Sequence, residues 1–344
     1  MKPLVLFLNE VAGGRMLLQN TLERASDASY VVVVAPQNQP AAGQLFNPAE
    51  AKQAARSRVD VTLGVLDEFG IDAVGEVLDP APDLALGDAI RSHRPSEVLL
   101  SCLYDSRFGL TRRALEEWAE GTFEPEVKIT HIPVRIEDDS ISREVTHTLV
   151  VANQTLSAPD LTERLLERAK ERPHRFTIIA PETEGVPLNK VSRDLAALMA
   201  NLYRNDIDAT GQPMSPDPFE SAKDSIAHYR VDDVLISTLP GQQSRWLESD
   251  LVGRVREITD KPVAHNKAGR SPEAVAAAVA EGEPVGVGAA SGSESGERGE
   301  AVNAGAPDAA RDPATGDSAD ESLGGDEYDR HAATQPEDTA EDEA

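Results

Sequence analysis

The chain has 344 residues and a formal net charge of −27, from 60 acidic and 33 basic residues. A surface this negative repels phosphate backbones and anionic membranes, so nucleic acid is excluded as an expected partner. No apolar run reaches the roughly 18 residues that a membrane-spanning helix needs, and the single cysteine, Cys102, precludes an internal disulfide. We therefore expect a cytoplasmic protein that is not inserted in a membrane.

Short runs of Val, Leu and Ile without polar alternation predict strands buried on both faces, as in a parallel sheet between two layers of helices. In the first part of the chain these runs cover residues 4–8, 30–35, 73–78, 98–103 and 127–132. Between them, apolar residues recur at helical spacing at 63–69, 84–90 and 110–118. Strands and helices are therefore expected to alternate.

The second part of the chain repeats this alternation. Apolar runs cover residues 148–152, 176–180, 234–238 and 262–265, with a weak run near residue 209. Helical patterns follow near 195, 219 and 247, and Ser192 and the Asp217-Pro218 pair predict two helix starts. The order predicts two tandem α/β sandwiches, each with a five-stranded parallel sheet and right-handed crossovers. We place the two domains at residues 1–136 and 146–270, with a linker at 137–145.

The C-terminal segment, residues 271–344, is predicted to be a mostly disordered acidic tail. Residues 281–344 hold 18 acidic against 3 basic residues, and Gly, Ala and Ser dominate the rest. Such a segment buries too little apolar surface to offset the entropy cost of ordering the chain.

Sequence matches in the same order indicate that the two domains are copies of one another. Leu-Glu-Arg-Ala at 22–25 recurs at 166–169, and Ile-Asp-Ala at 71–73 recurs at 207–209. The offsets between such matches stay between 136 and 145 residues. This period is too long for a solenoid repeat, so each copy is expected to hold its own core.

Ligands of open parallel sheets bind outside the carboxyl ends of the strands, where the strand order reverses. If the first and fourth strands meet there, the first copy offers Asn9, Ser101, Ser106 and Arg107. The second copy offers Asn153, Ser237, Gly241, Ser244 and Arg245. Ser106 and Ser244 are expected to cap the fourth helix of each copy, and a helix start beside an arginine is a candidate anion site. In the alternative interpretation the serine caps the helix, the arginine covers the neighbouring aromatic ring, and nothing binds.

Other reactive residue types show no recognisable catalytic pattern. His131 and His265 recur at the ends of the fifth strands, which favours a structural role. The histidines form no pair at helical spacing and no cysteine cluster accompanies them, so no metal site is expected. Cys102 is expected to be a small core residue, because no base is evident beside it in the sequence. Common hydrolase motifs are absent from the sequence, and we expect a protein that is not an enzyme.

The second copy carries the most specific pattern, with Asp-Asp-Val-Leu-Ile-Ser-Thr at 232–238 and Ser-Arg-Trp-Leu-Glu-Ser-Asp-Leu-Val at 244–252. With the Asn that follows each first strand, it resembles tandem universal stress proteins, within the adenine-nucleotide alpha-hydrolase-like superfamily. The resemblance covers roughly residues 3–268. It implies a strand order of 3-2-1-4-5, pairing of the two halves as a pseudo-dimer, a homodimer as a further option, and ATP binding in many members.

The glycines that hold ATP in such members are replaced in this chain. Members that bind nucleotide carry Gly-x2-Gly-x9-Gly-Ser/Thr after the fourth strand, because glycine lets the backbone close on the phosphates. The matching residues are Ser237, Pro240, Asp250 and Leu251 in the second copy, and Ser101, Tyr104, Ala114 and Leu115 in the first. Gly241 is displaced by one residue, and carboxylates at Glu248 and Asp250 would repel a triphosphate.

We therefore expect a stress-response or regulatory binding module with degenerate phosphate-binding loops and no required cofactor. One alternative is a protein that binds ATP or AMP through its second copy. The other is a nucleotide hydrolase of the same superfamily.

Overall fold

The computed structural model describes residues 1–9, 14–37, 47–79, 81–103, 107–108, 113–134, 145–183, 185–239, 246 and 249–269. Two five-stranded parallel sheets have the orders β3-β2-β1-β4-β7 and β10-β9-β8-β11-β12. These orders confirm the predicted fold class, and both sheets lie within one compact unit. Almost all of the predicted linker and all of the predicted tail lie outside the described residues.

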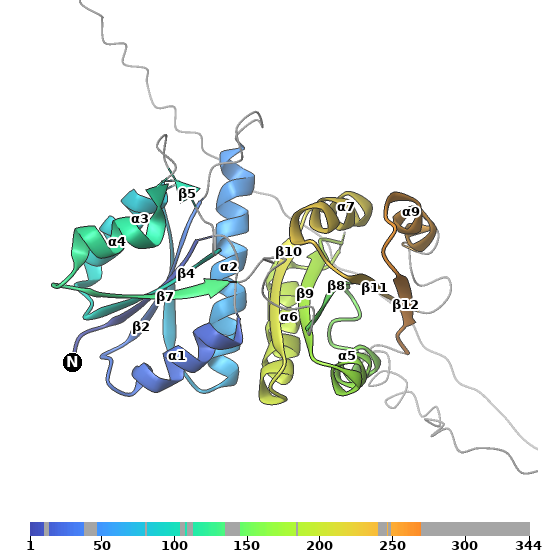
Figure 1. The fold of residues 1–344 in the computed structure, drawn as a ribbon, viewed down its shortest axis with the longest axis horizontal. Helices are drawn as coiled ribbons and strands as arrows, with labels where there is room; N and C mark the ends of the chain where they lie inside the picture. The colour runs from blue at the N-terminus through green and yellow to red at the C-terminus, as the bar shows by residue number, and fades with distance from the viewer. Residues whose placement is uncertain are drawn as a thin grey trace, which may run out of the picture. The chain divides into compact units, whose positions relative to one another are not determined.

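The first half alternates strands and helices along the chain (Figure 1). Its sheet consists of β1 (Leu4–Leu8), β2 (Val31–Pro36), β3 (Ala73–Leu78), β4 (Glu97–Leu103) and β7 (Lys128–Val134). Its helices are α1 (Arg15–Ala25), α2 (Pro48–Glu68), α3 (Pro82–His93) and α4 (Leu115–Phe123). Two short strands, β5 (Arg107–Phe108) and β6 (Arg113–Ala114), pair with each other before α4.

The second half repeats the pattern. Its sheet consists of β8 (Thr146–Val151), β9 (His174–Pro181), β10 (Asp208–Met214), β11 (Asp233–Thr238) and β12 (Val263–Lys267). Its helices include α5 (Pro159–Glu171), α6 (Leu188–Arg204), α7 (Pro218–Tyr229) and α9 (Leu251–Ile258). Asp217 caps α7 as predicted, because its carboxylate accepts a hydrogen bond of 2.8 Å from the Phe219 N–H. The start predicted at Ser192 is wrong: α6 begins one turn earlier, because Val191 already belongs to its apolar stripe, and Ser192 is buried within the helix.

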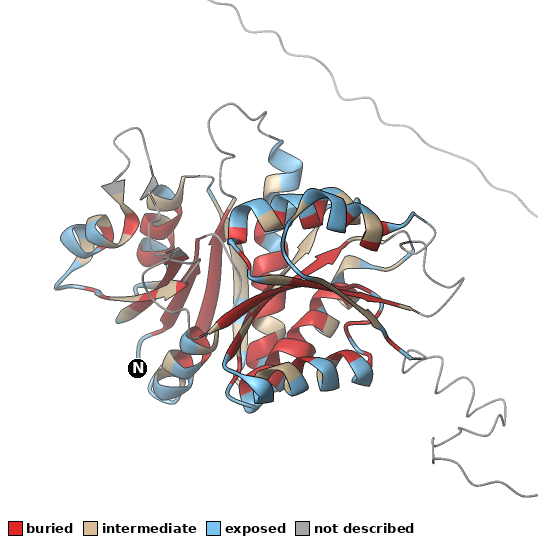
Figure 2. Ribbon diagram, turned by 45° about the vertical axis from the view of Figure 1, so that its right-hand side comes forward, coloured by how far each residue is buried: buried red, intermediate tan, exposed pale blue. Residues whose placement is uncertain are grey.

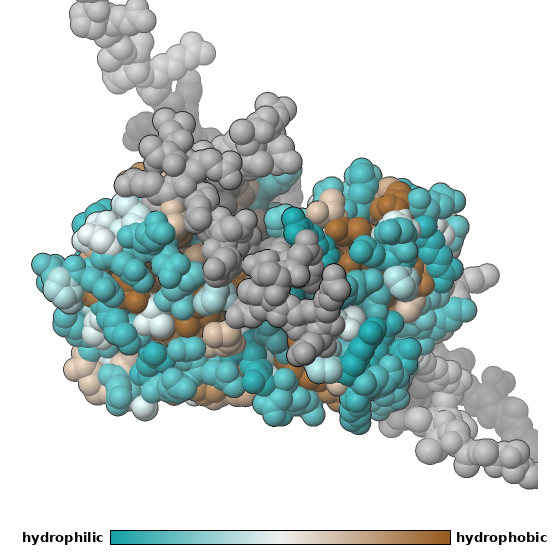
Figure 3. All heavy atoms as spheres, in the orientation of Figure 1, coloured by the Kyte–Doolittle hydropathy of each residue, from teal (hydrophilic) through white to brown (hydrophobic). Residues whose placement is uncertain are grey.

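Each sheet separates two apolar layers, and its central strands are buried on both faces (Figure 2). One face of the first sheet packs Phe7 and Leu100 against Leu86 of α3 and Leu115 of α4. The matching face of the second sheet has a cluster of its own, formed by residues of β8, β9, β11, α7 and α9. The outer face in the view of Figure 3 is mostly hydrophilic, as the charged composition requires.

The remaining faces of the two sheets share one apolar cluster, which joins residues such as Leu6 and Val65 to Ile178 and Leu195. The expectation of a separate core in each copy is therefore wrong for this layer. Helices α2 and α6 pack against each other in this cluster. A Cβ atom added at Gly64 would lie only 2.8 Å from the Cβ of Ala196, so glycine allows the two helices to approach this closely.

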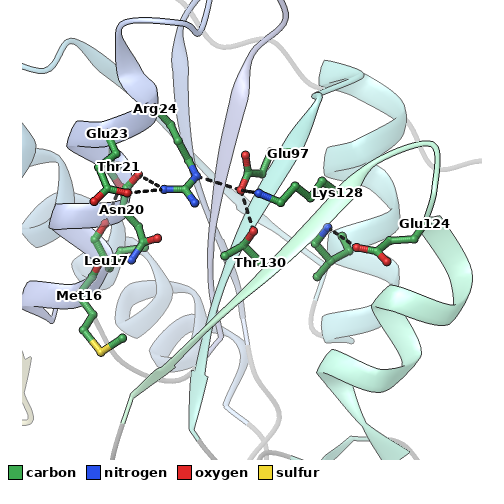
Figure 4. A network of polar contacts seen from close by, with 11 residues as sticks. Met16, Leu17, Asn20, Thr21, Glu23, Arg24, Glu97, Glu124, Lys128 and Thr130 are labelled. Atoms are coloured by element: carbon green, nitrogen blue, oxygen red, sulfur yellow. Dashed lines mark hydrogen bonds and ion pairs between the residues drawn. The ribbon is translucent and has the colours of Figure 1, made fainter.

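The duplicated Leu-Glu-Arg-Ala motif places an arginine against the start of the fourth strand in each half. In the first half, the Arg24 Nε atom lies 2.9 Å from a carboxylate oxygen of Glu97, which also accepts hydrogen bonds from Lys128 and Thr130 (Figure 4). In the second half, the Arg168 Nη1 atom contacts both carboxylate oxygens of Asp233 at 3.0 and 3.1 Å. In each half, the motif therefore ties the first helix to its sheet.

Candidate functional site

The strand order reverses between β1 and β4 in the first half and between β8 and β11 in the second. These two positions are the switch points at which ligands bind in open parallel sheets. Four of the predicted site residues are described there: Asn9, Ser101, Asn153 and Ser237. Ser106, Gly241, Ser244 and Arg245 lie outside the described residues, and only the backbone of Arg107 is described.

In the first half, Asn9 and Ser101 meet at the ends of β1 and β4. The Asn9 N–H donates a hydrogen bond of 2.9 Å to the Ser101 carbonyl oxygen, and both residues are buried. The Ser101 hydroxyl has no hydrogen-bond partner in the described part of the chain. Its neighbour in register on β7 is Ile132, which offers no polar group. A buried hydroxyl without a partner costs about 1–3 kcal/mol, so a ligand group that bonded to Ser101 would recover that free energy.

In the second half, the corresponding polar groups bond to one another. The Asn153 side-chain amide donates to the Pro181 carbonyl oxygen. The Ser237 hydroxyl accepts a hydrogen bond of 3.1 Å from Asn266, its neighbour in register on β12. The Thr155 hydroxyl donates to the Ser237 carbonyl oxygen at 3.3 Å. The predicted ligand groups Asn153 and Ser237 are therefore already engaged.

Carboxylates stand at the starts of α1, α4, α5 and α9. The Arg15 N–H of α1 donates a 2.9 Å hydrogen bond to Asp208, and Asp250 caps α9 with a contact of 3.2 Å to the Gly253 N–H. Asp160, in the first turn of α5, accepts a hydrogen bond from the Gly269 N–H. The first turn of α4 contains Glu116 and Glu117. A helix start ordinarily attracts anions, but here protein carboxylates already supply the negative charge.

The predicted cap of the fourth helix in the first half is wrong. Helix α4 begins at Leu115, with Ala114 at its N-cap, and not beside Ser106. The reason is local: Arg107 and Phe108 pair with residues 113–114 as strands, which delays the helix. The anion site predicted at Ser106 and Arg107 therefore has no helix N-terminus beside it to attract an anion.

Cys102 has a base beside it, contrary to the expectation from the sequence. Its sulfur lies 3.2 Å from Nε2 of His131, and Nδ1 of His131 lies 2.8 Å from a carboxylate oxygen of Glu116. In the second half, the Thr238 hydroxyl lies 2.8 Å from Nε2 of His265. The pairing register makes the two arrangements equivalent, because Leu100 pairs with His131 and Ile236 pairs with His265, two residues before Cys102 and Thr238 respectively.

The two histidines have different charged neighbours. His131 faces the carboxylate of Glu116. Burial, followed by the positive charges of Lys267 and Arg256, lowers the pKa of His265. Cys102 and His131 lie on β4 and β7, which the predicted order 3-2-1-4-5 makes neighbours, so this order is the one sequence signal that brings their strands together.

No metal cluster marks a second site among the described residues. No group of three or more His, Cys, Asp or Glu side chains in them is arranged to hold a metal ion. A shallow groove of about 340 Å³ lies along α4, lined by Ala114, Glu117, Trp118, Gly121 and Thr122. Within the described ranges, no helix has both the length and the apolar character to cross a membrane.

Comparisons with known proteins give only distant similarities. No family model matches the chain, and no curated protein sequence matches it. A universal stress protein from Archaeoglobus fulgidus DSM 4304 is similar with a TM-score of 0.30 and 13% identity, over 77% of this chain and 96% of that chain. A hexameric APS kinase from Thiobacillus denitrificans has a TM-score of 0.25 and 11% identity, over 81% of this chain and 66% of its own. A histidinol dehydrogenase from Elizabethkingia anophelis has a TM-score of 0.21 and 10% identity, over 77% of this chain and 53% of that chain.

Proposed function

We propose that this chain is a non-enzymatic regulatory binding module of the universal stress protein type, acting in the cytoplasm as a pseudo-dimer of two domains. The strand orders support this proposal, as does the buried asparagine that follows the first strand of each half. The observation that carries the ligand site is the Ser101 hydroxyl, which is buried beside Asn9 without a partner in the described residues. The first half would bind the ligand, and the second half would serve as its structural partner.

The charges at the site favour a neutral or cationic ligand over a nucleoside triphosphate. Asp208 occupies the start of α1, and Glu116 and Glu117 occupy the first turn of α4. Two unit charges of like sign about 4 Å apart repel by about 4 kcal/mol at an effective dielectric constant near 20. A triphosphate would meet this repulsion at both helix starts, whereas a nucleoside would not.

The rival proposal is ATP or AMP binding in the second half, through Asn153, Ser237, Gly241, Ser244 and Arg245. It requires Asn153 and Ser237 to give up the hydrogen bonds that they make to Pro181 and Asn266. Each lost bond would cost the rival site about 1 kcal/mol. This cost favours the first half.

Calorimetric titration with adenosine, AMP and ATP, with and without magnesium, tests the proposal. We expect affinity to fall as phosphates are added. We also expect Ser101→Ala to abolish binding, and the matched variant Ser237→Ala to leave it unchanged. Micromolar ATP binding that Arg245→Ala abolishes would establish the rival site. Phosphate release during the titration would identify a hydrolase, and the absence of saturable binding by any of the three would overturn the ligand position at Ser101.

A further inference from the structure

Three side chains of the first half form a chain from solvent to a buried sulfur. The carboxylate of Glu116 on α4 is 2.8 Å from Nδ1 of His131 on β7, and Nε2 of His131 is 3.2 Å from the sulfur of Cys102 on β4. The side chain of Glu116 is 37% exposed and that of His131 is 12% exposed, while Cys102 is 2% exposed. A proton that leaves the thiol therefore has a path through the imidazole toward the surface.

The order of the three groups matches the arrangement that activates a nucleophile. A thiol reacts as its thiolate, and a neighbouring imidazole that accepts the thiol proton raises the thiolate fraction. A carboxylate on the far nitrogen fixes the imidazole ring and stabilises its protonated form. The apolar neighbours of Cys102, which include Phe7, Leu100 and Leu115, oppose this charge separation. The imidazole of His131 accepts the thiol proton and so offsets the unfavourable effect of these apolar neighbours on the thiolate.

The geometry points to Cys102 as a peroxide-reactive thiol, with His131 as its base and Glu116 as the residue that positions His131. The small exposed area of Cys102 favours an electrophile that is small and uncharged, which hydrogen peroxide is, over a peptide or an ester. The thiol proton moves to Nε2 of His131 and the thiolate sulfur attacks one peroxide oxygen. The S–O bond forms as the O–O bond breaks, and the departing hydroxide takes the proton from His131 and leaves as water.

The product is a sulfenic acid, in which sulfur has lost two electrons and the peroxide has gained them. Cys102 is the only cysteine of the chain, so no internal thiol condenses with the sulfenic acid. Its reduction requires two equivalents of an external thiol, which yield one disulfide and one water. The oxidised state would therefore persist until a small-molecule thiol or another protein supplies those equivalents.

The test is the rate at which hydrogen peroxide oxidises Cys102 in the folded, full-length protein, followed by dimedone trapping and mass spectrometry. A thiol with an ordinary pKa near 8.5 is about 3% thiolate at pH 7, so complete activation raises the rate by at most about thirtyfold. We expect His131→Gln to slow oxidation about tenfold and to lower the ultraviolet absorbance of the thiolate. We expect Glu116→Gln to slow oxidation about threefold and Glu116→Asp to restore most of the rate.

The second half supplies a matched control, because His265 occupies the equivalent position beside Thr238. His265→Gln should leave the oxidation rate of Cys102 unchanged within about twofold, because His265 belongs to the other half and its partner there is a hydroxyl. Circular dichroism verifies that each variant folds. If His131→Gln does not fold, the native protein is compared with the same chain in urea, and the native thiol must react faster. Equal rates in the native protein and His131→Gln, or a native thiol slower than the unfolded one, would overturn the inference.

Discussion

The two halves share a strand order but differ in the side chains that surround one histidine. In the first half, His131 lies between the sulfur of Cys102 and the carboxylate of Glu116. In the second half, His265 bonds to the hydroxyl of Thr238, and burial, followed by the positive charges of Lys267 and Arg256, lowers its pKa. Equivalent strand register therefore does not give the two histidines the same chemical role. Two differences separate the candidate reactive site from a structural hydrogen bond: a thiol stands in place of a hydroxyl, and a carboxylate in place of positive charges.

A second difference lies at the switch points. Ser237 is bonded to Asn266, whereas Ser101 has Ile132 as its neighbour in register. One residue on the last strand therefore decides whether the serine hydroxyl at the end of the fourth strand is satisfied within the protein. The Ser101 hydroxyl of the first half has no hydrogen-bond partner in the described residues, whereas the matching Ser237 hydroxyl has one.

The largest expected effect concerns the duplicated arginine. Removing one partner from a buried ion pair costs about 3–5 kcal/mol, because the other charge is left buried. The side chains of Arg168 and Asp233 are only 12% and 14% exposed. We therefore expect Arg168→Met to lower the free energy of unfolding by about 3 kcal/mol, measured by urea denaturation.

The matched variant Arg24→Met should cost only about 1 kcal/mol. Glu97 keeps its contacts with Lys128 and Thr130 after the change, at 2.9 and 2.7 Å. Equal losses of unfolding free energy in Arg24→Met and Arg168→Met would show that Lys128 and Thr130 do not stabilise the Glu97 carboxylate once Arg24 is removed.

The serine pair should respond in opposite directions. Ser237→Ala removes a hydrogen bond and should lower the free energy of unfolding by about 1 kcal/mol. Ser101→Ala removes a buried hydroxyl without a partner in the described residues, so it should raise stability by about 1 kcal/mol. Thermal denaturation of both variants measures the difference. Loss of stability in Ser101→Ala would mean that its hydroxyl is satisfied within the folded protein.

The smallest expected effect is a difference in pH dependence. Burial alone would raise the pKa of Glu97, but hydrogen bonds from Thr130, Lys128 and Arg24 hold it below its ordinary value of 4.5. As the pH falls below 4.5, the unfolded chain takes up this proton first, so the stabilisation is lost as the pH passes through the lower, folded-state pKa.

The measurement is unfolding free energy against pH for the native protein and for Glu97→Gln. The difference between the two should be largest at neutral pH and should narrow below pH 4.5. Glu163→Gln, at an exposed position of α5, provides the control. A constant difference down to low pH would contradict the lowered pKa of Glu97.

Most of the architecture could be predicted from the sequence because strand burial is a local signal. The apolar runs at 4–8 and 73–78 match β1 and β3 residue for residue, and the run at 234–238 falls one residue inside β11. Strands β1 and β11 are buried between helices, so their composition alone marks them, whereas β3 at the edge of its sheet is only partly buried. The start of α4 was misplaced because the pairing of β5 with β6 depends on backbone hydrogen bonds and not on an apolar pattern.

The candidate thiol site could not be predicted in the same way, because its parts are far apart in sequence. Cys102 and His131 meet only through the register of β4 with β7, and Glu116 reaches them from the intervening helix. The shared apolar cluster was missed for the same reason, since an apolar stripe on α2 does not specify whether it covers its own sheet or another helix.

The close approach of Gly64 to Ala196 limits which side chains the two helices can carry where they meet. A side chain at residue 64 would collide with the partner helix, so change at one position is tolerated only with a matching change at the other. A larger residue at either position therefore acts on both halves of the molecule at once.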